Sequence, residues 1–162
     1  MKKLITIILL LITFISNAQI ETEKTDVKTR EEVISAPMLI CSTPDRNRWF
    51  VIVPKIVKSN GIIIKVYFTT LKQDIGKCSN NDVLVFTFKD GRKIRISANN
   101  EKTCNGLYEL DFPLNSIDVA FLETKILDNI RYINGNDFVS FVYFSTPDNN
   151  NYFVNTFYNL KN

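Results

Sequence analysis

Residues 82–98 read DVLVFTFKDGRKIRISA, and this stretch decides the fold because it describes two short strands joined by a tight turn. Apolar and polar residues alternate in both halves, which is typical of strands buried on one face. The apolar positions fall on one face of each half: Leu84, Phe86 and Phe88 in the first, and Ile94, Ile96 and Ala98 in the second. The stretch therefore predicts an antiparallel hairpin with one buried face.

The length of the turn follows from the need to match these two faces. A two-residue turn at Asp90 and Gly91 would set the apolar residues of the first half against cations of the second. One residue of slip turns every side chain to the other face. A loop of three residues, either 89–91 with Gly91 as a bulge or 90–92, places both apolar sets on one side. We therefore predict a three-residue loop.

The same hairpin places two of the three cysteines. Extended outward, one register sets Cys78 directly opposite Cys104, and the other sets them two residues apart on the same side. In an oxidising compartment this favours a disulfide between them. Closing a loop of about 27 residues would stabilise the fold by roughly 3–4 kcal/mol in the chain-entropy model. Cys41 is left over and is expected to be a buried apolar residue, with pairing to another chain or a reactive thiol as alternatives.

Outward from the hairpin, short runs rich in β-branched and aromatic residues predict further strands, and Ser59-Asn60-Gly61 predicts a hairpin turn. One short helix is predicted near 116–125, with Asn115 or Ser116 as its N-cap. The fold is predicted to be mainly β, either a β-sandwich or a strongly curved antiparallel sheet that carries this helix. The predicted strands are 33–41, 48–57, 62–71, 82–89, 92–98, 107–112, 126–133, 138–144 and 152–158.

The N-terminus predicts export. Residues 1–18, MKKLITIILLLITFISNA, contain two lysines, an apolar run and small residues before Gln19, which is typical of a cleaved signal peptide. The apolar run of about a dozen residues is shorter than the roughly 20 that cross a bilayer. Residues 19–32 are polar and predict a flexible leader, so that 33–162 forms a single β-rich domain. We expect a periplasmic or secreted protein that does not insert into the membrane after cleavage.

The composition excludes several classes of catalytic and metal site. The chain contains no histidine, which removes Ser-His-Asp and Cys-His nucleophilic sites, histidine bases and histidine metal ligands. Two of the 20 basic residues and none of the 17 acidic residues lie in 1–18, so residues 19–162 carry a net charge of +1. A chain so close to neutral gives no overall electrostatic reason to bind nucleic acid. We expect no enzyme activity and no resident metal or cofactor.

One motif occurs twice, as STPDRNRWFV in residues 42–51 and as STPDNNNYFV in residues 145–154, with seven of ten positions identical. Both copies are predicted to be hairpin loops built on a Pro-Asp turn. A structural turn is the simplest explanation. Two alternatives are calcium binding through carboxylate and amide oxygens, and a glycan site with aromatic platforms. The candidate ligand-binding residues are Asp45, Asn47, Trp49, Asp148, Asn150 and Tyr152.

Three segments resemble parts of uncharacterised small secreted proteins of Bacteroidetes: the Asn17-Ala18-Gln19 end of the signal, the FKDG turn at 88–91 and LETKILDNIR at 122–131. In those proteins a similar order of strand, DG turn, strand and short helix recurs over roughly the last half of the chain. The resemblance implies export and a β-rich fold, and it carries no catalytic residues to this sequence.

These observations predict an exported, non-enzymatic domain with a binding or structural role at the cell envelope, where its partner would be an envelope protein or a glycan. The first alternative is a ligand-binding module for a glycan or calcium that uses the repeated loops. The second is a histidine-free hydrolase that uses carboxylates, for which Asp45, Asp148, Glu109 and Asp111 are available.

Overall fold

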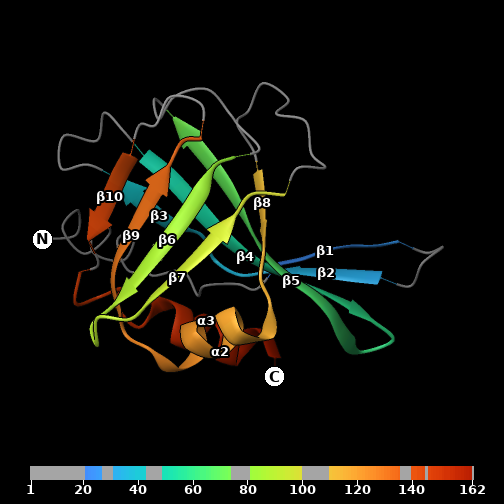
Figure 1. Cartoon of the computed structure of the whole chain (residues 1–162). Helices are drawn as coiled ribbons and strands as arrows, with labels where there is room; N and C mark the ends of the chain where they lie inside the picture. Colours follow the sequence, from blue (N-terminus) through green and yellow to red (C-terminus); the bar gives the residue numbers. More distant parts are fainter. Residues whose placement is uncertain are drawn as a thin grey trace, which may run out of the picture.

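The strands of the protein form two antiparallel sheets that lie one in front of the other in the computed structural model (Figure 1). The structure describes residues 21–26, 31–42, 49–73, 81–99, 110–135, 140–144 and 146–161. Sheet A has the order β1-β2-β4-β5-β8, with β3 also paired to β4, and sheet B has the order β10-β9-β6-β7. This arrangement confirms the mainly β fold.

The bounds of the strands follow the predicted apolar runs closely in most places. Sheet A contains β1 (Glu21–Asp26), β2 (Glu31–Ser35), β3 (Leu39–Ser42), β4 (Trp49–Ser59), β5 (Ile62–Gln73) and β8 (Leu110–Pro113). Sheet B contains β6 (Val83–Phe88), β7 (Lys93–Ser97), β9 (Leu127–Ile133) and β10 (Ser140–Phe144).

The hairpin of β6 and β7 has the three-residue loop that the matching of faces requires. Phe88 N donates to Arg92 O (3.0 Å), and Gly91 N donates to Phe88 O (2.9 Å), which closes a loop over residues 89–91. Gly91 adopts φ +82°, a conformation that glycine reaches without the steric cost of a side chain. Of the two predicted registers, the structure has the one with Gly91 at the end of the loop.

The turn between β4 and β5 is also as predicted. Ser59 pairs with Ile62, which leaves Asn60 and Gly61 as a two-residue loop. Both have positive φ, 51° and 79°, which is the requirement of the type I′ turn that suits the right-handed twist of the strands.

Aromatic rings fill the space between the two sheets. Phe68 of sheet A lies 5.5 Å from Phe86 of sheet B, measured between ring centroids. Phe153 lies 5.4 Å from each of these rings, so the three rings form one contact group, called here the aromatic junction. All three side chains are almost fully buried. Rings at such distances contribute about 0.5–1.5 kcal/mol per pair beyond the burial of their area.

The predicted helix is present as α2 (Ser116–Thr124). Asn115 is its N-cap, and its side chain accepts hydrogen bonds from Ile117 N and Asp118 N, both 2.9 Å. The side chain of Asp118 in turn accepts a hydrogen bond from Asn115 N at 3.2 Å, which completes a capping box.

The predicted strand 152–158 is wrong, because these residues belong to a second helix, α3 (Tyr152–Lys161). The second copy of the repeated motif is therefore not a hairpin loop, since it leads from β10 into a helix. The buried residues of α3 are Phe153, Thr156, Phe157 and Leu160. Their spacing follows the helical period of 3.6 residues, which lets one side of α3 cover the end of the space between the sheets.

Two further differences lie near the N-terminus. The predicted strand 33–41 is divided into β2 and β3, with Pro37 in the break; a proline has no N–H to donate to a sheet ladder. The segment 19–32, predicted to be a flexible leader, contains β1, which pairs antiparallel with β2. The polar composition of β1 did not indicate a strand. The backbone of β2 supplies its pairing partner.

We expect Phe153→Ala to lower the free energy of unfolding by about 3–5 kcal/mol, because the substitution leaves a cavity where three aromatic rings meet. Phe153→Leu should lower it less and keeps the protein folded for comparison. Tyr158→Ala on the same helix is the control: Tyr158 is 70% exposed, so its loss should change stability by no more than about 0.5 kcal/mol. Urea unfolding measures all three. Equal losses for Phe153→Ala and Tyr158→Ala would contradict the central place of the aromatic junction.

Candidate functional site

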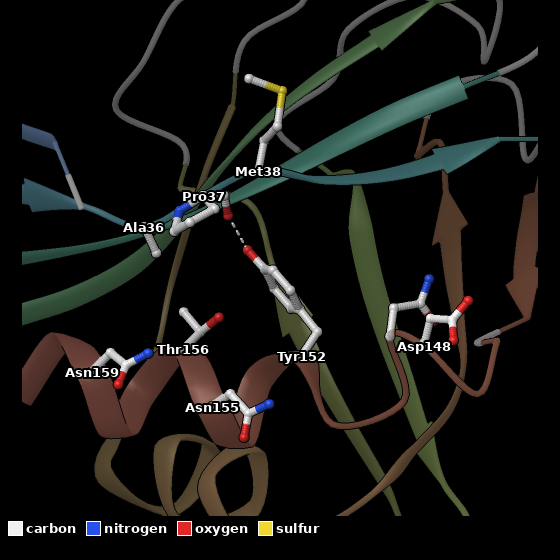
Figure 2. Close-up of a pocket in the computed structure, with 9 residues that line it drawn as sticks. Ala36, Pro37, Met38, Asp148, Tyr152, Asn155, Thr156 and Asn159 are labelled. Carbon is white, nitrogen blue, oxygen red and sulfur yellow. Dashed lines mark hydrogen bonds between the residues drawn. The ribbon is translucent and has the colours of Figure 1, made fainter. Parts of the chain in front are cut away.

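A hollow of about 370 Å³ lies between α3 and the break that separates β2 from β3 (Figure 2). One wall is formed by the residues of the break, and the other by the turn before α3 and the exposed side of its first turns. The lining residues are Ala36, Pro37, Met38, Asp148, Asn149, Tyr152, Asn155, Thr156 and Asn159. The second copy of the repeated motif therefore contributes three of them.

The turn before α3 is held by its own side chains and backbone. Asn149 Oδ1 accepts a hydrogen bond from Thr146 N (2.7 Å), and Asn150 N donates to Thr146 O (2.9 Å). Asn149 also donates from Nδ2 to the hydroxyl of Tyr143 in β10. Asparagine and proline favour such turns because the amide side chain satisfies nearby backbone groups and proline presets φ. In this turn Asn149 is structural: its amide is already occupied at both ends.

Tyr152 joins the two walls of the hollow. Its hydroxyl donates to the backbone oxygen of Pro37, and its ring packs edge-on against Phe153 with centroids 4.9 Å apart. Burial raises the pKa of Tyr152, while a side-chain hydrogen bond with Thr156 lowers it in part. The ring is thus held by contacts with Phe153 and Pro37 on two sides of the hollow.

The free polar groups of the hollow come from α3. Asn155 and Asn159 are exposed, lie one helical turn apart on α3 and line the hollow (Figure 2). Among the described residues that line the hollow, Asp148 is the one charged residue and none is basic. Amide groups both donate and accept hydrogen bonds, and a carboxylate accepts only. The chemistry therefore suits a neutral ligand with several hydroxyl groups better than an anion.

The structure brings together only part of the predicted ligand set. Asp148 and Tyr152 line the hollow, whereas Asn150 does not, and its backbone oxygen accepts a hydrogen bond from Leu127 N at 2.9 Å. Asp45 and Asn47, the matching residues of the first copy, lie outside the described residues.

Trp49 lies in a different concavity, of about 540 Å³, lined by Ile40, Ser42, Trp49 and Val51. Ser42 pairs with Trp49 at one end of β3, and Pro37, the contact of Tyr152, precedes the other end. Five residues of extended chain at about 3.3 Å each separate Ser42 from Pro37 by roughly 16 Å. The two aromatic residues of the repeated motif therefore line two separate concavities.

The carboxylates of the hydrolase alternative are not gathered in one place. Asp111 is buried in β8 and accepts a hydrogen bond from the hydroxyl of Thr69, its partner across the sheet, at 2.9 Å. Asp148 lines the hollow, which Asp111 does not. Glu109 and Asp45 lie outside the described residues. In the described part of the chain, no three acidic or cysteine side chains gather as metal ligands would.

The sequence-based prediction did not include seven residues of the hollow: Ala36, Pro37, Met38, Asn149, Thr156, Asn155 and Asn159. The signal for the last two was present, because Asn151, Asn155 and Asn159 recur every four residues, the spacing of neighbours on a helix face. Met38 had no comparable signal, since its place depends on the break between β2 and β3.

Comparisons with known proteins do not add to this picture. No family model matches the chain, and no match is found among curated proteins or among solved structures. No helix within the described ranges combines the length and the apolar character needed to span a membrane. Function is therefore inferred from the residues and their geometry.

Cys41 is buried in β3, where it pairs with Phe50 of β4, and burial raises the pKa of its thiol well above the ordinary value. A thiol in this state is a poor nucleophile, because the thiolate is the reactive form. Cys41 thus fits the expected buried apolar residue. Cys78 and Cys104, the predicted disulfide pair, lie outside the described residues.

We expect the native, non-reduced protein to show no thiol that reacts with dithionitrobenzoate, and the unfolded, non-reduced protein to show one per chain. That one is Cys41, and reduction before the assay should raise the count to all three cysteines. Cys41→Ser is the matched control and should give none without reductant. Three thiols in the unfolded protein before reduction would contradict the Cys78–Cys104 disulfide.

Two tyrosines, the buried Tyr132 and the partly buried Tyr152, should make the fold sensitive to alkaline pH. Burial raises the pKa of both Tyr152 and Tyr132, and the carboxylate of Asp82, which accepts a hydrogen bond from Tyr132 at 2.6 Å, raises that of Tyr132 further. A raised pKa means that the folded state favours the neutral phenol. The stabilisation is therefore complete below the unfolded pKa of about 10 and is lost as pH rises above it.

We expect part of the phenolate absorbance to appear only together with loss of the circular dichroism signal as pH is raised. The chain unfolded in guanidinium, in which all six tyrosines are accessible, is the control and should titrate in one step near pH 10. Full phenolate absorbance at a pH where the circular dichroism is still native would contradict the burial of these two hydroxyls.

Proposed function

We propose that the chain is an exported, non-enzymatic domain that binds a neutral, hydroxyl-rich ligand at the cell envelope through the hollow beside α3. A sugar unit of a glycan is the ligand class that fits this chemistry. The observation that carries the proposal is the composition of the lining, in which Asn155 and Asn159 supply exposed amides and the described residues include no cation.

Export is supported by residues 1–18, with their paired lysines, apolar run and small residues before Gln19. A binding role is supported over a catalytic one by the composition: the chain lacks histidine, and the thiol of Cys41 is buried. The proposal does not require that the protein change the ligand chemically. It requires only that the ligand recognise a preformed hollow.

The size of the hollow supports a small ligand. A volume of about 370 Å³ lies at the lower end of the range of roughly 300–1,000 Å³ typical of ligand pockets. The contact of Tyr152 with Pro37 holds the walls together before any ligand binds. A preformed site loses less conformational freedom on binding, which favours affinity.

We expect a neutral glycan that binds the hollow to raise the thermal unfolding midpoint of the chain from Gln19 onward. A ligand that binds only the folded state adds about 2.7 kcal/mol when present at 100 times its dissociation constant. The panel is a set of soluble neutral polysaccharides and their oligosaccharides. Asn155→Ala should remove most of the shift, because Asn155 lines the hollow. Asn151→Ala is the matched control, an exposed asparagine of the same segment that does not line it, and should keep the shift.

The same measurement separates the two alternative ligand sites. A shift produced by calcium and removed by EDTA would favour the cation interpretation of Asp148 and the first copy of the motif. A glycan-induced shift that persists in Asn155→Ala and changes the fluorescence of Trp49, the one tryptophan, would favour the concavity of Trp49. The absence of any shift would reject the hollow as a ligand site and leave a structural role at the envelope.

A further inference from the structure

The outer face of sheet B presents its side chains in rows that cross its strands. The middle row is Arg95 of β7, Val85 of β6, Arg131 of β9 and Val142 of β10, since each is the direct pairing partner of the next. The row beside it is Lys93, Thr87, Asn129 and Phe144, and a third row, over β7, β6 and β9, is Ser97, Val83 and Ile133. No acidic residue occupies any position in these rows.

Three cations dominate this face. Lys93, Arg95 and Arg131 are all exposed. Among the residues that the structure describes, their charged groups make no ion pair or hydrogen bond. Sheet B lies in front of sheet A, and α2 and α3 lie below the sheets, so neither helix covers this face (Figure 1). We call these three residues the basic face.

Edge protection explains only part of the basic face. Charged side chains on an edge strand discourage pairing with other chains, and β7 is an edge strand, which accounts for Lys93 and Arg95. Arg131 is different, because β9 lies inside the sheet between β6 and β10. A cation there protects no edge, and its neighbours across the strands are Val85 and Val142.

The nearest acids are occupied elsewhere. At the lower rim of sheet B, Asp128 pairs with Lys89 at 2.5 Å, and Asp90 pairs with Lys125 at 2.9 Å. These partners lower the pKa of both carboxyls, mainly through the side-chain hydrogen bonds from the two lysines. Arg92 also pairs with Asp90 at 3.7 Å, so both rim carboxylates are engaged at the rim, and neither pairs with the basic face.

We propose that the basic face binds an extended acidic polysaccharide, one that carries carboxylate or sulfate groups at intervals along the chain. Arg95 and Arg131 are separated by two strand spacings, about 9–10 Å, and Lys93 lies one row away, about 7 Å along the strand. Guanidinium groups bind carboxylate and sulfate oxygens with two parallel hydrogen bonds. A flat face with spaced cations fits a polymer whose charges are spaced likewise.

The spacing argues against nucleic acid as the partner. Duplex DNA carries one charge per about 1.7 Å of its axis, and its binding depends on neutralising many phosphates together. Three cations and a net charge of +1 over residues 19–162 supply little of that attraction. The rest of the face suits a sugar chain: Asn129 is a partly exposed amide beside the cations, and Phe144, 67% exposed, can lie against the apolar side of a sugar ring.

The test measures binding of the chain from Gln19 onward, which contains every described residue, to immobilised polysaccharides. The probes are polygalacturonate for carboxylate groups, heparin for sulfate groups, dextran as a neutral polymer and single-stranded oligothymidylate for phosphate groups. We expect binding to one or both acidic polysaccharides and none to dextran. The double variant Arg95→Gln, Arg131→Gln should weaken that binding by at least about tenfold and make it less dependent on salt.

The matched control is Lys58→Gln, Lys65→Gln, which removes the same charge from sheet A. It should bind the acidic polysaccharides with the affinity of the unmodified chain. Asn155→Ala in the hollow should also keep this affinity, which distinguishes the basic face from the proposed glycan site. Thermal midpoints of both double variants should match the unmodified chain, since the altered residues lie on the surface. Four outcomes would overturn the proposal. The first two are an equal loss of affinity in both double variants and equal binding to dextran. The others are tighter binding to oligothymidylate than to the acidic polysaccharides, and no binding to any probe.

Discussion

The contact of Phe68, Phe86 and Phe153 is the constraint on which the rest of the structure depends. Here sheet A, sheet B and α3 meet through side chains that are almost fully buried. Because the sheets are held at this point, the end of the space between them is closed by α3. The exposed side of α3 then faces the break before β3, and the hollow forms between them.

The structure also shows how much of the fold is local. The β6–β7 hairpin could be predicted down to the length of its loop, because matching two apolar faces leaves few registers. The turn at Asn60 and Gly61 could be predicted as well, and the N-cap of α2 could be narrowed to Asn115 or Ser116, since each feature depends on residues within a few positions of one another. These elements satisfy backbone groups through partners that are close in the sequence.

What could not be predicted depends on contacts distant in sequence. The repeated motif makes this plain: STPD and an aromatic-Phe-Val run occur in both copies, yet the first continues into β4 and the second into α3. Phe50 and Phe153 occupy equivalent positions and are both buried. The residues that follow decide the outcome. After Phe50 the chain is rich in β-branched residues, which favour strands.

After Phe153, Asn155 and Asn159 repeat at helical spacing, and Phe157 falls on the buried side. The alternation of apolar and polar residues, taken alone, predicts a strand for these residues. The helical period becomes decisive only when one side is known to be covered by the sheets. Contacts distant in sequence also decide the candidate site. Asp148 and Tyr152 could be selected from the motif, whereas Met38 lines the hollow only because the chain breaks between β2 and β3 at Pro37.

Net charge illustrates the same difference between composition and placement. A value of +1 over residues 19–162 suggests a surface without electrostatic preference. The fold instead pairs Asp90 and Asp128 with lysines at the rim of sheet B and leaves Lys93, Arg95 and Arg131 together on its outer face. The separation follows from strand alternation, because residues two apart on β7 must share a face, and register then places Arg131 in the same row as Arg95. Such a face exerts its attraction within about a Debye length, roughly 8–10 Å at physiological salt, where the surface nearest a ligand matters more than the total charge.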